Sequence, residues 1–167
     1  YSQGHYAEAI RILNKIKDMD RSAQVFDSQL INYTFGFLYF STNQFTSALN
    51  YFKMYEDTND DFIISSIANC YYALGKYKTA ISYSMKLKEL QYQDKELLYS
   101  SYFELKDYTN ANKYALQLLD ENYSFDNLMK VQATSAYDNT KLNYAYKARE
   151  IAQSDEQIIY ANQAIAP

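Results

Sequence analysis

The side chains that could support acid–base or metal chemistry are few in this 167-residue chain. The only histidine, His5, directly follows a glycine at the start of an expected helix. A general base or a metal ligand needs partners that converge on it, and the chain has no second histidine and a single cysteine. A histidine-centred metal site or catalytic triad cannot be built from these residues. We therefore interpret His5 as a surface or interhelical residue.

The single cysteine, Cys70, lies between Asn69 and Tyr71 in the first helix of an expected hairpin. A reactive thiol needs an electropositive, partly exposed environment, whereas a free cysteine usually packs in the interior as a small apolar side chain. We expect Cys70 to be buried and inert. One cysteine also excludes an intrachain disulfide, and it does not indicate a cellular compartment.

Four carboxylates between Glu56 and Asp61 form the densest acidic cluster. The segment lacks the glycine and the terminal glutamate of a calcium-binding loop. We interpret these carboxylates as helix caps and as favourable charges at a helix N-terminus. The three glycines are separated by whole helices, so no glycine-rich phosphate loop occurs. The sequence thus predicts a non-enzymatic protein with no catalytic residues, no cofactor and no metal site.

Composition narrows the kind of partner. The formal net charge is −4 with acidic and basic residues interspersed, and nothing resembles the basic stripe that neutralises phosphates, so we do not expect nucleic acid as a partner. The apolar runs are short and interrupted by polar residues, which predicts no membrane span. The chain starts at Tyr1 rather than Met and reads as an excerpt of a longer protein, so the missing signal-peptide pattern indicates no compartment.

A repeated unit of about 34 residues organises the chain, which is typical of a stacked repeat array. In each copy an alanine follows a ring or a large apolar residue by three positions. The pairs are Tyr6 and Ala9, Phe45 and Ala48, Tyr77 and Ala80, Tyr108 and Ala111, and Leu142 and Ala145.

The segment from Ile64 to Leu90 is the clearest copy. Small and apolar residues recur at three- and four-residue steps as far as Tyr71, which predicts one face of a helix. Gly75 can adopt a left-handed turn, and helical spacing then resumes at Tyr77. Each copy is therefore predicted to be two antiparallel helices joined by a tight turn.

The predicted fold class is all-α, a right-handed α-solenoid of antiparallel helix hairpins. The low content of 3 glycines and 1 proline disfavours a turn-rich β architecture. The expected elements are the second helix of a first repeat at 5–17, hairpins at about 28–57, 60–90, 93–120 and 126–153, and a final helix at about 155–165. The segment 18–27 carries about five residues more than the corresponding part of the other copies, and it is expected to form a longer helix or a loop.

The motif of a small residue, a tyrosine three positions later, a turn and then G-x-Y-x-x-A resembles the tetratricopeptide repeat (TPR) family over nearly the whole chain. Three features depart from that pattern. Tyr99 stands where a glycine or alanine is expected, Ala136 stands where a tyrosine is expected, and the only proline is Pro167. We expect the last two hairpins to pack less regularly as a result.

The resemblance implies that the first helix of each hairpin lines a concave groove. The groove is expected to be apolar and aromatic in its N-terminal part and more polar further on. Residues on these helices that are not needed for stacking define the predicted partner-binding set, which comprises Leu30, Tyr33, Phe37, Phe40, Phe62, Ser65, Asn69, Tyr72, Gln93, Glu96, Ser100, Phe103, Asn127, Lys130, Thr134 and Tyr137.

TPR co-chaperones hold a partner's C-terminal carboxylate with a clamp of Lys, Arg and Asn residues. Most matching positions here are apolar or aromatic, and Asn69 and Lys130 fall in different repeats, so the clamp is missing. An exposed aromatic row in a monomer usually has a use. We interpret the chain as a protein–protein interaction scaffold or adaptor for a peptide segment or helix of another protein.

Three alternatives stay open. The groove could serve a regulatory receptor for a small peptide. The array could be an accessory domain of a larger enzyme. Alternatively, an N-terminal segment of the parent protein, or superhelical curvature, could cover the aromatic row. The first helix carries apolar residues spaced to bury on both sides. We therefore expect the natural protein to continue N-terminally, and the incomplete first repeat to permit self-association.

Overall fold

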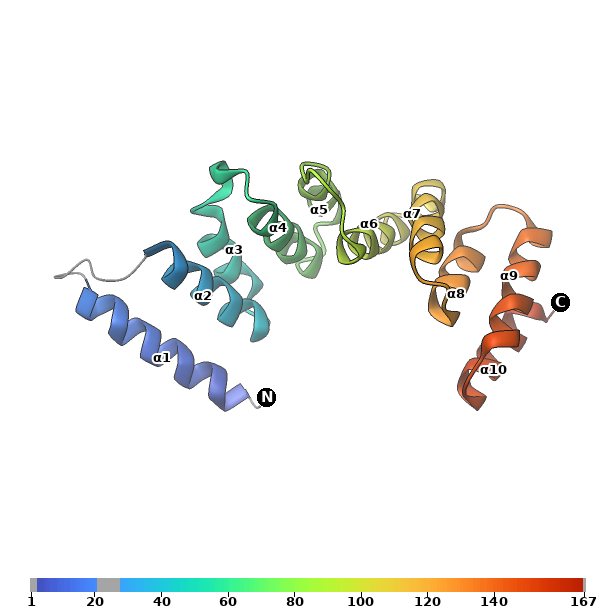
Figure 1. Ribbon diagram of the computed structural model, residues 1–167, viewed down its shortest axis with the longest axis horizontal. Coiled ribbons are helices and arrows are strands. Elements are labelled where there is room, and N and C mark those ends of the chain that lie inside the picture. Colours follow the sequence, from blue (N-terminus) through green and yellow to red (C-terminus); the bar gives the residue numbers. More distant parts are fainter. Residues whose placement is uncertain (1–2, 21–27, 167) are drawn as a thin grey trace. The chain divides into compact units, whose positions relative to one another are not determined.

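The computed structural model describes residues 3–20 and 28–166 (Figure 1). These residues form ten α-helices and one 3-10 helix and contain no strand, which confirms the all-α prediction. The helices are α1 (Gln3–Asp20), α2 (Ser28–Ser41), α3 (Phe45–Lys53), η1 (Glu56–Thr58), α4 (Asp61–Ala73), α5 (Tyr77–Ser84), α6 (Tyr92–Glu104), α7 (Tyr108–Glu121), α8 (Phe125–Thr134), α9 (Asp138–Ile151) and α10 (Asp155–Ile165).

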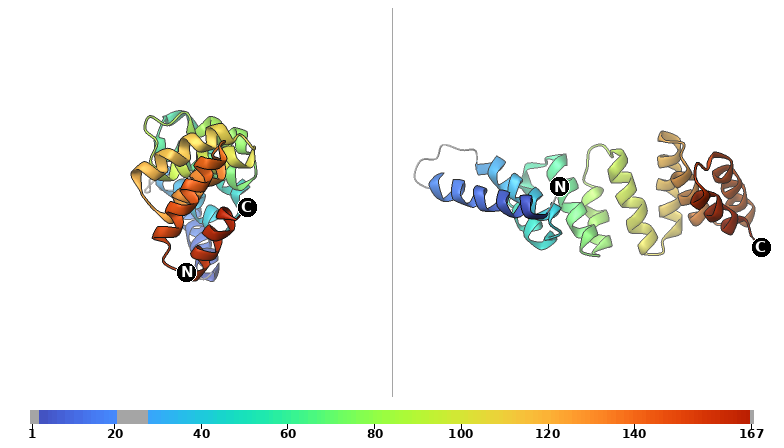
Figure 2. Two further views of the ribbon diagram at one scale, coloured as in Figure 1. Left: turned by 90° about the vertical axis from the view of Figure 1, so that its right-hand side faces the viewer. Right: turned by 90° about the horizontal axis from the view of Figure 1, so that it is seen from below.

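The chain divides into two compact units, each described by itself: the N-terminal unit, Tyr1–Lys88, and the C-terminal unit, Glu89–Pro167. In the N-terminal unit, α1 lies beside α2 and the hairpins α2–α3 and α4–α5 pack in succession (Figure 1). In the C-terminal unit, the hairpins α6–α7 and α8–α9 pack against each other and α10 packs on α9 (Figure 2). Consecutive helices are thus neighbours throughout each unit.

The first three hairpins share one turn. The backbone becomes left-handed two residues after the first helix has ended, and the amide of the next residue donates a hydrogen bond to the carbonyl of a tyrosine five positions back, as in a Schellman motif. The left-handed residues are Asn43 (φ 60°), Gly75 (φ 71°) and Lys106 (φ 59°). The bonds are Gln44 N to Tyr39 O (2.8 Å), Lys76 N to Tyr71 O (2.9 Å) and Asp107 N to Tyr102 O (2.9 Å).

Two ring pairs recur in these hairpins and account for much of the aromatic content. One pair stacks across the two helices: Tyr39 on Tyr51 (centroids 5.6 Å apart), Tyr71 on Tyr83 (5.3 Å) and Tyr102 on Tyr114 (5.9 Å). The other pair closes the turn: Phe40 with Phe45 (5.3 Å), Tyr72 with Tyr77 (5.6 Å) and Phe103 with Tyr108 (5.5 Å). Offset and tilted ring contacts of this kind add to the apolar area that the rings bury.

Small residues allow the helices of a hairpin to approach closely. A Cβ atom added to Gly36 would lie 2.6 Å from the Phe52 ring. Four of the five alanines that define the repeat, Ala48, Ala80, Ala111 and Ala145, are fully buried. Any larger side chain at these positions would have to push the neighbouring helix away, because protein interiors have no spare volume.

The α8–α9 hairpin departs from the shared turn. Helix α8 ends at Thr134 and Ser135 is extended (φ −67°, ψ 139°). The Ser135 hydroxyl donates to the Val131 carbonyl (2.7 Å) and the Thr134 hydroxyl donates to the Lys130 carbonyl (2.8 Å). Side chains that compete for helix carbonyls in this way favour a helix end. The hairpin is held instead by a core of Leu128, Met129 and Ala148, against which Leu119, Phe125, Tyr144, Ile151 and Ala164 pack.

The acidic cluster has the structural role that the sequence indicated. Asp60 is the N-cap of α4, where its carboxylate accepts a hydrogen bond from the Phe62 amide (2.9 Å). Glu56 accepts a hydrogen bond from the Tyr83 hydroxyl (2.5 Å) and lies 3.7 Å from Lys53 Nζ and 3.6 Å from Lys86 Nζ. The Tyr83 hydrogen bond, with the two lysines, lowers the pKa of Glu56. The cluster therefore links η1 to α5 and caps α4.

Two sequence-based expectations at the N-terminus fall partly outside the described residues. The extra segment at 18–27 begins as a continuation of α1, which extends to Asp20, and its remainder is not described. The His5 side chain also lies outside the described part of the structure.

Candidate protein-interaction surface

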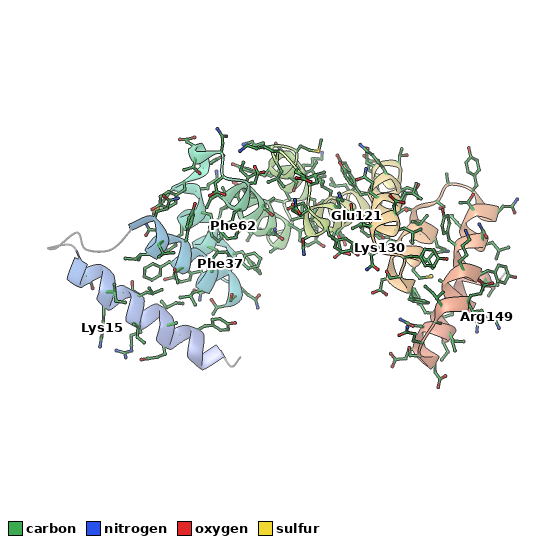
Figure 3. The ribbon with its side chains drawn as sticks, viewed as in Figure 1. Lys15, Phe37, Phe62, Glu121, Lys130 and Arg149 are labelled. Carbon is green, nitrogen blue, oxygen red and sulfur yellow. The ribbon has the colours of Figure 1, made fainter. Side chains whose placement is uncertain are left out.

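Four apolar and aromatic residues gather on the first helices of the N-terminal unit. We call Leu30, Tyr33, Phe37 and Phe62 the aromatic patch. Phe37 of α2 and Phe62 of α4 lie side by side, with ring centroids 5.2 Å apart (Figure 3). Leu30, Phe37 and Phe62 are 63%, 40% and 49% exposed, so the patch presents apolar surface to solvent.

The hairpin core supports the patch from beneath. The Phe37 ring makes an edge-to-face contact with the ring of the fully buried Phe52, and the two ring centroids are 5.6 Å apart. Tyr33 lies against Tyr55 at 5.2 Å, and the Tyr55 hydroxyl accepts a hydrogen bond from the Asn32 amide (2.8 Å). Because their inner edges are held, the patch rings can contact a partner with little loss of conformational entropy.

The other predicted groove residues of this unit are less available. Phe40 and Tyr72 are half-buried members of the turn-closing ring pairs. Ser65 and Asn69 are half-buried on α4, where the Asn69 amide donates to the Ser65 carbonyl (2.9 Å). The structure therefore brings together only part of the predicted set in the N-terminal unit.

A cleft of about 660 Å³ lies between α6, α8 and α10 of the C-terminal unit. Two predicted groove residues, Phe103 and Lys130, line it. Sequence reasoning missed the other lining residues, which are Tyr99, Phe125, Asp126, Met129, Ala133, Glu156, Gln157 and Tyr160. Tyr99 had a detectable signal, because it replaces the glycine or alanine of the repeat pattern. We call this space the C-terminal cleft.

Lys130 is held in place at one side of the C-terminal cleft (Figure 3). Its ammonium group forms an ion pair with Glu96 of α6, another predicted groove residue. It also donates a hydrogen bond to Asn127 Oδ1 (3.0 Å) and lies 5.7 Å from the centroid of the Tyr99 ring. Burial, followed by the proximity of Tyr160, raises the pKa of Tyr99 to about 12.

Two predicted groove residues of the last hairpin, Asn127 and Thr134, are wrong because their side chains are buried. Asn127 is fully buried, and its amide donates to the Tyr92 hydroxyl (3.0 Å) and to the carbonyls of Leu118 (3.0 Å) and Asn122 (2.9 Å). It therefore ties α8 to α6 and α7 instead of facing a partner.

Thr134 is 4% exposed and accepts a hydrogen bond from Asn112 (3.0 Å). Tyr137 is exposed but lies beyond the end of α8, at the N-cap of α9. Because α8 ends at Thr134, Tyr137 does not lie on the helix on which the sequence predicted it. The two remaining predicted residues lie on α6, where Gln93 is exposed and Ser100 is half-buried.

The thiol considered for chemistry has inert surroundings. Cys70 is fully buried, and burial raises the pKa of its thiol to about 12, so the nucleophilic thiolate is disfavoured. Among the described residues, no group of three or more His, Cys, Asp or Glu side chains could hold a metal ion. Within the same residues, no helix is both long enough and apolar enough to cross a membrane.

Comparison with known proteins supports the fold. The crystal structure of MamA protein, a TPR-containing protein, superimposes with a TM-score of 0.70 at 18% sequence identity, and the match covers 82% of this chain and 78% of that chain. No protein-family model matches the sequence, and no curated protein matches it. The chain therefore has a TPR-like fold of helical hairpin repeats.

Proposed function

We propose that the protein is a non-catalytic interaction scaffold or adaptor, and that the aromatic patch binds a peptide segment or helix of a partner protein. The observation that carries this proposal is the exposure of Leu30, Phe37 and Phe62 at one place on the first helices of two hairpins. Monomeric proteins seldom expose clustered apolar side chains without a binding role.

The patch also has the chemical character of an interaction hot spot. Rings supported by a rigid core supply most of the binding free energy at many interfaces, and the apolar face of a partner helix would be complementary to them. The MamA likeness supports this reading at the level of fold, since helical hairpin repeats present extended surfaces.

Site-specific photo-crosslinking tests the proposal. A benzophenone amino acid placed at position 37 or 62, in the protein expressed in its natural host, should crosslink to the same partner from both positions. A matched control carries the group at Met54, which is 60% exposed. Met54 lies at the C-terminal end of α3, the second helix of its hairpin, and outside the aromatic patch. If the same products form from position 54, or if 37 and 62 yield different products, the aromatic patch is not the binding surface.

A further inference from the structure

The C-terminal cleft has the size and lining of a ligand site. Its volume, about 660 Å³, falls within the range of about 300–1,000 Å³ that is usual for binding pockets. Tyr99 and Phe103 of α6, Met129 of α8 and Tyr160 of α10 supply apolar walls from three helices. The Tyr160 ring is 56% exposed, so a ligand would cover apolar area that is now in water.

A departure from the repeat pattern contributes to this cleft. Tyr99 occupies the position that corresponds to Gly36 in the α2–α3 hairpin, where a side chain would meet the second helix. The Tyr99 ring instead lies 5.8 Å from Phe103 and near Lys130, on the side of α6 that lines the cleft. The bulky residue therefore adds a wall to the cleft at a position where the repeat needs only a small residue.

The unmatched charge of the cleft is negative. Asp126 and Glu156 lie in the first turns of α8 and α10 and line the cleft as exposed carboxylates. Neither forms an ion pair with any described residue, whereas the one lining cation, Lys130, is paired with Glu96. Each helix N-terminus offsets only about half of one negative charge. A cationic ligand is thus favoured over an anionic one.

We propose that the C-terminal cleft binds a short segment of a partner protein that presents an apolar side chain next to a lysine or arginine. This inference rests on the proposed scaffold function and names the chemistry of one of its ligands. The apolar side chain lies against Tyr99, Met129 and Tyr160. The basic side chain lies between the carboxylates of Asp126 and Glu156.

Tryptophan-containing peptides test the proposal directly, because the protein contains no tryptophan. The probe is a short peptide, capped at both ends, in which a Trp–Leu pair precedes two arginines. Three comparison peptides replace the arginines by glutamates, replace Trp–Leu by Trp–Ser, or scramble the order. Titration with the full chain should shift the tryptophan emission saturably for the first peptide, and more salt should weaken its binding.

Variants of the cleft separate specific from adventitious binding. Tyr160→Ala removes an exposed ring and should weaken binding of the arginine peptide about tenfold. Asp126→Asn with Glu156→Gln should weaken it about fivefold and reduce its salt dependence. The matched control, Glu104→Gln with Glu150→Gln, removes the same charge from exposed positions that do not line the cleft and should bind as the parent does.

The proposal is overturned if the glutamate peptide binds as tightly as the arginine peptide, or if the control pair weakens binding as much as the cleft pair. It is also overturned if Tyr160→Ala leaves the affinity unchanged. If one of these results is obtained but positions 37 and 62 crosslink to the same partner, the scaffold function is still supported and the C-terminal cleft is not a binding site. Peptide binding at the cleft without that crosslinking would instead support the cleft and remove the aromatic patch.

Discussion

Gly36 of α2 and Phe52 of α3 are in such close contact that a single methyl group would not fit between them. A Cβ atom at Gly36 would lie 2.6 Å from the ring of Phe52, which is fully buried and has no room to move. This contact fixes the separation of the two helices that support the aromatic patch, because Phe37 packs on the same Phe52 ring.

Gly36→Ala should lower the free energy of unfolding by about 1–3 kcal/mol, since overpacking forces a buried ring or helix to shift. Phe52→Leu removes the obstructing ring atoms, so the same glycine substitution should cost less in that background. Urea unfolding of the four proteins in this double-mutant cycle measures the coupling. Strictly additive effects would show that the Gly36–Phe52 contact does not limit helix approach.

Lys106 has a left-handed backbone conformation in the turn of the α6–α7 hairpin. Gly75 has this conformation at the equivalent position of the preceding hairpin. A residue with a Cβ pays about 1–2 kcal/mol in that conformation, and glycine loses about 0.5–1 kcal/mol more entropy on folding. Lys106→Gly should therefore stabilise the protein by about 0.5–1 kcal/mol. Lys113→Gly, within α7, should destabilise by about 1 kcal/mol. Thermal unfolding measures both changes. If the two glycine substitutions change the melting temperature in the same direction, the left-handed conformation of Lys106 does not limit stability.

Cys70 should resist thiol reagents in the native protein. Its side chain is fully buried and the pKa of its thiol is raised to about 12, so both access and thiolate are lacking. The labelling rate should match the rate of opening and should rise when urea unfolds the chain. Rapid stoichiometric labelling without urea would show that α4 opens readily or that the thiol is accessible.

Much of the fold could be predicted from the sequence because residues within each repeat mark the helix contacts and the turns. The recurring alanines mark the buried contact between helices, and Gly75 marks a left-handed turn that Asn43 and Lys106 also adopt. The stacked tyrosine pairs follow from the same period, although only the structure shows which rings meet across each hairpin.

The candidate site was harder to predict because it depends on where the period fails. Counting from the repeat placed Asn127, Thr134 and Tyr137 on an exposed helix face. Helix α8 ends early at Thr134, and Asn127 serves a buried hydrogen-bond network between three helices. Tyr99 was visible as a departure from the pattern, but the direction of its ring required the packing of α8 and α10.

Tyr99 of the C-terminal cleft should make the free energy of unfolding depend on pH in the alkaline range. Burial raises the pKa of Tyr99 to about 12 in the folded chain, against about 10 for an unfolded tyrosine. The unfolded state therefore loses this proton first, and the stabilisation present below pH 10 is lost as the pH rises towards 12. Tyr99→Phe should flatten this decline in urea-unfolding free energy. An equally steep decline in the variant would place the Tyr99 hydroxyl in water.

Binding of a partner by the aromatic patch is tested most directly by calorimetric titration of the protein with the partner that the crosslinking identifies. Phe37→Ala with Phe62→Ala should weaken binding by at least about 2 kcal/mol, roughly thirtyfold. The control Met54→Ala changes an apolar residue that is more exposed than either ring and that directly follows α3, and this variant should bind as the parent does. Circular dichroism should show that both variants remain helical. Unchanged affinity in the double variant, or an equal loss in Met54→Ala, would contradict the assignment of this surface.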